Sequence, residues 1–66
     1  KPAPGMMFLK DLPIGKMFET SSGIRGVLLD CEINAKVVIL DAKVEEEDRQ
    51  YYLGKQIIAA ETEVYK

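Results

Sequence analysis

The chain has 66 residues, of which 47% are hydrophobic and 30% charged, and its formal net charge is −2. This length and balance predict one small folded domain, and the acidic net charge disfavours a dedicated nucleic-acid-binding protein, which usually has a basic face. One cysteine and no histidine exclude an internal disulfide bond and a cysteine–histidine zinc site. Small domains that have neither a disulfide bond nor a metal site are often stabilised by association, so self-association of this chain is favoured.

Residues 1–5 are expected to be a cloning remnant or a disordered tail, and residues 6–66 a single small β-barrel domain. The opening stretch does not resemble a signal peptide, because Pro2 and Pro4 stand where an apolar core is needed. No apolar run reaches the ~18 residues of a membrane span. Together with the single thiol, these features predict a cytoplasmic protein that has no membrane partner.

Short segments rich in β-forming residues alternate with glycine, proline and asparagine, which is typical of an all-β domain. The first predicted strand, 6–12, is short and lies at an edge. Pro13 and Gly15 then favour a turn. The next predicted strand, 16–20, is expected to place Phe18 in the core.

Two glycines separated by two residues, Gly23 and Gly26, precede the clearest strand. A G-x-x-G loop clamps a nucleic-acid backbone in one class of RNA-binding domain, where helices flank it. Here a β-rich run follows and no long helix is expected, so a hairpin turn is favoured. Gly23 is expected to have a positive φ in the turn, and Gly26 to lie at a bulge or bend.

The strand predicted at 24–33 alternates between two faces. The residues expected to face the core are Val27, Leu29, Cys31 and Ile33. The residues expected to face outward are Leu28, Asp30 and Glu32.

The strand predicted at 36–44 is apolar on both faces over the four residues Val37, Val38, Ile39 and Leu40. A solvated antiparallel strand does not have this pattern, so one face is expected to be covered by a second layer or by a partner. A hairpin turn around Asn34 joins this strand to the preceding one, and a loop of two or three residues fits equally well. In either register, Leu28 and two of these four residues form an apolar patch on the outer face of the sheet.

The segment 45–55 breaks the strand pattern and is predicted to be an irregular loop or a short helical turn that ends at Gly54. Its acidic run, Glu45–Asp48, lacks the spacing of a calcium loop and is interpreted as a solvated loop. Two further short strands are predicted at 56–59 and 62–66. The sequence thus predicts an antiparallel β-barrel of about five strands.

No set of residues predicts a catalytic or metal site. Cys31 has no histidine partner and is flanked by Asp30 and Glu32, so it is interpreted as a small core residue. No cofactor is expected. An enzyme with a site in a cleft between subunits is kept as an alternative, since such a site could use tyrosine, lysine and carboxylate groups.

Several residues together resemble the small SH3-like β-barrel proteins of bacteria and phages. The matching residues are Leu12, Gly15, Phe18, Gly23, Gly26, Val37, Val38, Thr62 and Val64. This resemblance implies the fold only. Proteins of that fold class bind RNA, DNA or peptides or form rings, so no activity and no functional residue is carried over.

The leading functional prediction is a non-enzymatic interaction module that self-associates as a dimer or a higher oligomer, and a different protein partner is left open. The predicted interface residues are Leu28, Val37, Val38, Ile39, Leu40, Tyr51 and Tyr52. An alternative is an RNA- or DNA-binding regulator whose oligomer forms one basic face. The residues predicted to contribute to that face are Lys16, Arg25, Lys36 and Arg49.

Overall fold

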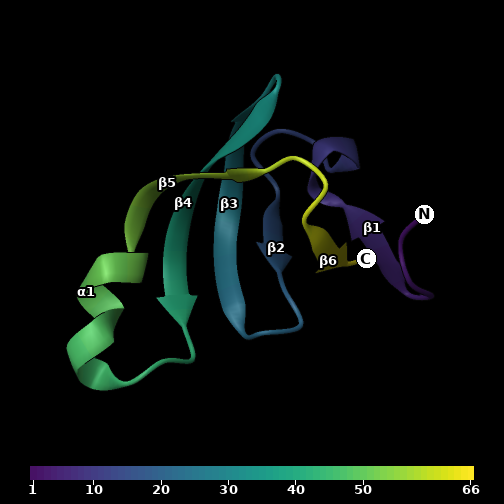
Figure 1. Ribbon diagram of the computed structural model, residues 1–66. Helices are drawn as coiled ribbons and strands as arrows, with labels where there is room; N and C mark the ends of the chain where they lie inside the picture. Colours follow the sequence, from purple (N-terminus) through teal and green to yellow (C-terminus); the bar gives the residue numbers. More distant parts are fainter.

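The computed structural model describes residues 1–66 as two antiparallel sheets (Figure 1). The larger sheet has the strand order β2-β3-β4-β5, formed by β2 (Met17–Glu19), β3 (Ile24–Cys31), β4 (Asn34–Ala42) and β5 (Gly54–Ala59). The smaller sheet pairs β1 (Met6–Phe8) with β6 (Glu63–Tyr65). The prediction of a small all-β fold is therefore confirmed.

The two sheets do not close into a barrel, because neither β2 nor β5 pairs with a strand of the smaller sheet. There are six strands, one for each of the six segments predicted, although the barrel was expected to have about five. A 3₁₀ turn, η1 (Leu9–Asp11), connects the sheets through backbone hydrogen bonds from Leu9 to Thr62 and from Lys10 to Ala60, each 2.9 Å long. Figure 1 shows both chain ends on this side, beside β1 and β6.

The segment between β4 and β5 contains two short helical turns, where the sequence predicted an irregular loop or one short helical turn. They are the 3₁₀ turn η2 (Glu46–Asp48) and the α-helical turn α1 (Arg49–Tyr52). Gly54 follows with a φ of 95°, which a glycine adopts without strain. None of the helical segments is long and apolar enough to cross a membrane.

The prediction of which β3 residues face the core is wrong for most of the strand. Leu28 is fully buried, whereas Leu29 is 42% exposed and Ile33 is 89% exposed. Register shifts between Arg25 and Gly26 and between Leu28 and Asp30 interrupt the pairing with β4. The first shift adds Leu40 to β4, and only the second adds a residue, Leu29, to β3. The alternation of β3 therefore changes phase after Leu28, and a single alternating pattern does not describe the whole strand. Cys31 lies beyond the second shift and packs against the core.

The core lies between the inner face of the larger sheet and the smaller sheet. Its buried residues are Leu9, Phe18, Leu28, Ala35, Val37, Ile39 and Val64. The prediction that Phe18 is a core residue is confirmed. Gly26 lies at a register shift, as predicted, and a Cβ atom there would come within 2.5 Å of the Val38 carbonyl oxygen and 3.0 Å of the Phe18 ring. Gly23 has a φ of 90° in the β2–β3 turn.

Candidate interaction surfaces

The outer face of the larger sheet carries an apolar patch that nothing in the chain covers. It consists of Met17 on β2, Val27 and Leu29 on β3, Val38 and Leu40 on β4, and Ile57 on β5. Met17, Leu29, Leu40 and Ile57 are exposed, and the two valines are half-buried. Contiguous apolar patches on a protein surface often mark interaction sites. We call this patch, with the charged residues in the same rows, the outer face.

The centre of the outer face is set by the register of the strands. Met17 lies opposite Val27, Val27 opposite Val38, and Val38 opposite Lys55, so these four side chains form one row across the sheet. Leu40 is the extra residue of β4 at the shift beside Gly26. The row places three apolar side chains next to each other, as expected for a surface that packs against another sheet.

Charged residues lie at both ends of this apolar centre. Arg25 on β3 pairs in register with Asp41 on β4, and Asp30 on β3 pairs with Lys36 on β4. Asp30 and Lys36 make no ion pair within 4.0 Å, although Asp30 Oδ1 accepts a hydrogen bond of 2.9 Å from the Cys31 N–H. Asp30 and Lys36 are therefore available to form ion pairs with a partner.

Asp41 and Arg49 form the best-aligned ion pair of the chain. Arg49 Nη1 donates to Asp41 Oδ1 at 2.7 Å and to the Ala42 carbonyl at 3.1 Å, which holds α1 against the end of β4. The hydrogen bond from Arg49 is the main reason that the pKa of Asp41 is lowered, and the bond from the Ala42 N–H lowers it further. This arrangement fixes the position of α1 relative to the sheet.

The structure brings together some, but not all, of the four basic residues of the alternative nucleic-acid prediction: Lys16 and Arg25 line one hollow, and Arg25 and Arg49 both lie near Asp41. Arg49 is bound to Asp41, and Arg25 lies 3.5 Å from Glu19. Lys36 lies at the opposite end of the β3–β4 pair, in the row of Asp30. Lys16 precedes β2 and is exposed.

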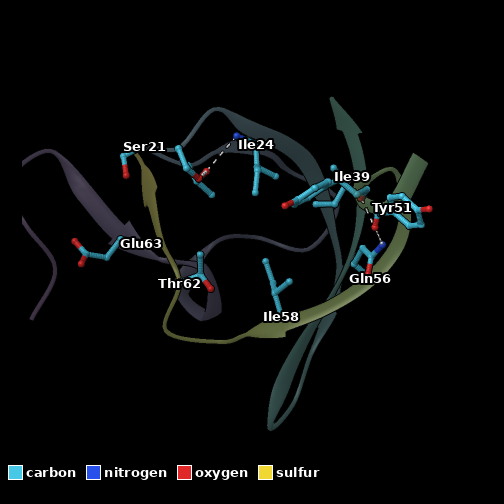
Figure 2. Close-up of a pocket in the computed structure, with 11 residues that line it drawn as sticks. Ser21, Ile24, Ile39, Tyr51, Gln56, Ile58, Thr62 and Glu63 are labelled. Carbon is cyan, nitrogen blue, oxygen red and sulfur yellow. Dashed lines mark hydrogen bonds between the residues drawn. The ribbon is translucent and has the colours of Figure 1, made fainter. Parts of the chain in front are cut away.

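The inner side of the larger sheet has a groove of about 530 Å³ where the two sheets fail to join. Figure 2 shows Ile24, Ile39 and Ile58 pointing into this space. Tyr51 and Tyr52 line the groove from α1, and Tyr51 is 72% exposed. The two tyrosines predicted as interface residues therefore belong to the groove and not to the outer face.

The groove is of the size of a small-molecule site, and most of its polar side chains, though not the hydroxyls of Ser21, Tyr51 and Tyr52, are hydrogen-bonded within the chain. Gln56 Nε2 donates to the Tyr51 and Tyr52 carbonyls at 3.3 and 3.5 Å. Glu63 is the one charged residue of the lining. Its Oε1 accepts a hydrogen bond of 2.8 Å from the Ala3 N–H, and its carboxylate points away from the isoleucines in Figure 2.

The predicted interface residues divide between the core and the surface. Leu28, Val37 and Ile39 are buried within the chain itself, whereas Val38 and Leu40 lie on the outer face. The residues that the sequence reasoning missed are Met17, Val27, Leu29 and Ile57. Alternation in 16–20 and 56–59 could have indicated Met17 and Ile57. The outward position of Val27 and Leu29 could not be predicted, because the extra residue of β3, Leu29, changes the phase of its alternation.

No group of three or more Asp, Glu or Cys side chains is placed so that it could hold a metal ion. Cys31 is half-buried. No protein-family model, curated protein or solved structure matches the chain.

Proposed function

We propose that this chain is a non-enzymatic interaction module that forms a homodimer through the outer face. The observation that carries this proposal is the row of apolar side chains on that face, together with the exposed Leu29, Leu40 and Ile57 around it. We also propose that its fold is a variant of the small SH3-like barrel that is left open between its two sheets.

The limited core of the chain supports association. Of the seven buried residues of the core, only four are large side chains that are fully buried, namely Leu9, Leu28, Val37 and Val64. A domain of this size buries only about 60% of the surface that its unfolded chain exposes. Packing a second sheet on the outer face would bury its apolar side chains and add the missing layer, as in a β-sandwich.

A homodimer is favoured over a foreign partner because the face is self-complementary. Its apolar centre matches itself, and each of its two terminal β3–β4 rows contains one acidic and one basic residue. The closed, two-fold dimer is the commonest symmetric assembly and uses the same patch on both copies. Self-association also requires no ligand, cofactor or modification.

The test compares the solution mass of two lysine variants by light scattering. Val38→Lys places a charge at the centre of the outer face and should reduce the mass from twice 7.4 kDa to 7.4 kDa. Tyr51→Lys introduces the same charge on the groove side and should leave the dimer intact. Circular dichroism checks that both variants remain folded. Dissociation by Tyr51→Lys but not by Val38→Lys would show that the proposed face is wrong.

A further inference from the structure

The outer face carries an alternating pattern of charges around its apolar centre. Along β3 the order is Arg25, Val27, Asp30, and along β4 the order opposite these residues is Asp41, Val38, Lys36. On this face β3 is therefore basic at its Arg25 end and acidic at its Asp30 end, whereas β4 is acidic opposite Arg25 and basic opposite Asp30. This pattern restricts how two copies could stack in the homodimer proposed above, on which the following inference rests.

We propose that the two-fold axis of the dimer runs parallel to the strands, between β3 and β4. This axis places β3 of one copy over β4 of the partner copy. Val27 then packs on Val38 of the partner copy, and Asp30 meets Lys36 of the partner copy. Asp30 and Lys36, which form no ion pair within the chain, thus each face a charge of opposite sign, which favours this register of association. At the other end Arg25 faces Asp41 of the partner copy, although each of these two already pairs within its own chain, with Glu19 and Arg49.

A two-fold axis across the strands is disfavoured because it brings two like charges together on the edge strand β5. Such an axis through the Val27–Val38 row also brings opposite charges together at both ends of β3 and β4. However, Lys55 lies in the same row as Val38 and would then face Lys55 of the partner copy. The axis along the strands instead places Lys55 over Met17 of the partner copy, where its aliphatic stem can pack on the thioether.

The arrangement is tested with two charge-reversal variants, Asp30→Lys and Lys36→Asp. Both positions are exposed and free of ion pairs, but Asp30→Lys removes the hydrogen bond from the Cys31 N–H, and each variant places two like charges opposite one another within the chain. Circular dichroism therefore first checks that both variants remain folded. In either homodimer, two opposite-charge contacts become two like-charge contacts. We expect each variant alone to dimerise about ten- to thirtyfold more weakly than the unmodified chain, since each such contact is of the order of a surface ion pair.

Mixing the two variants in equal amounts should restore dimerisation. In the mixed dimer, the lysine introduced by Asp30→Lys in one copy faces the aspartate introduced by Lys36→Asp in the other. The unchanged Lys36 of the first copy faces the unchanged Asp30 of the second, so every contact is again between opposite charges. Sedimentation equilibrium at low salt should give a dissociation constant within about threefold of the unmodified chain. A labelled Asp30→Lys copy should bind the unmodified chain more weakly than it binds Lys36→Asp, because its mixed dimer with the unmodified chain keeps one contact between like charges.

The outcomes separate the axis from the dimer itself. If the unmodified chain dimerises but the mixture is no tighter than either variant alone, the axis along the strands is wrong while self-association stands. If Lys55→Ala tightens the dimer, the axis along the strands is also contradicted, because a repulsive Lys55–Lys55 contact that the change could relieve exists only with the axis across the strands. If the unmodified chain is monomeric, the proposed function fails first.

Discussion

A direct prediction about stability concerns Leu28 and Leu29 of β3, which lie on the opposite faces from those that the sequence predicted. Alternation through the strand would make Leu29 a core residue and Leu28 a surface residue. In the structure Leu28 is fully buried and Leu29 is 42% exposed. We therefore compare Leu28→Ala with Leu29→Ala, two changes that remove the same atoms from adjacent positions.

The expected losses of unfolding free energy differ severalfold. Leu28 has no exposed surface, so its truncation leaves a cavity in the core and should cost about 2–5 kcal/mol. Leu29 is only partly covered in the single chain, and its truncation should cost about 1 kcal/mol. A domain of this size is expected to have only about 3–5 kcal/mol of stability, so Leu28→Ala should be largely unfolded.

Urea unfolding followed by far-UV circular dichroism measures both losses. The protein concentration is kept low, because covering Leu29 in a dimer would add to its apparent cost. The expected result is a folded Leu29→Ala with a slightly lower midpoint and a Leu28→Ala that lacks strand signal even without urea. A Leu28→Ala that is more stable than Leu29→Ala would refute the assignment of the register shift.

Two further predictions concern the backbone and the ion pair of α1. Gly26→Ala should destabilise the fold by about 1–3 kcal/mol or more, because its Cβ would lie 2.5 Å from a backbone oxygen of Val38; an unchanged urea midpoint would contradict this close approach. The folded-state pKa of Asp41 lies below its usual 3.8, so the Asp41–Arg49 pair should stabilise the fold above that pH and lose this effect as the pH falls through the lowered value. Urea midpoints between pH 2 and 7 should therefore fall more for the unmodified chain than for Asp41→Asn, and parallel curves would exclude the contribution.

Much of the strand pattern could be predicted from the sequence because the relevant signals are local. Phe18 lies in the core as alternation indicates, and Gly23 and Gly26 have the backbone roles expected of them. The register shift between Leu28 and Asp30 could not be predicted, because an extra residue in a strand leaves no local signal in a run such as Val27–Cys31. One such shift exchanged the faces of Leu28 and Leu29.

The candidate surface was predicted only in part for the same reason. Val38 and Leu40 are on the outer face, consistent with the expectation that two residues of that segment form an apolar patch. Met17 and Ile57 lie on the same face because β2 pairs with β3 and β5 pairs with β4, which local patterns do not show. The groove depends on the failure of the two sheets to join, which no local pattern indicates. Tyr51 lines it because Arg49 holds α1 against the end of β4.

Sedimentation equilibrium of the unmodified chain over a range of concentrations tests self-association most directly. We expect the average mass to rise from 7.4 kDa in dilute solution toward twice that value and no further, since a two-fold dimer covers the outer face of both copies. A mass of 7.4 kDa at every concentration would contradict the proposed homodimer.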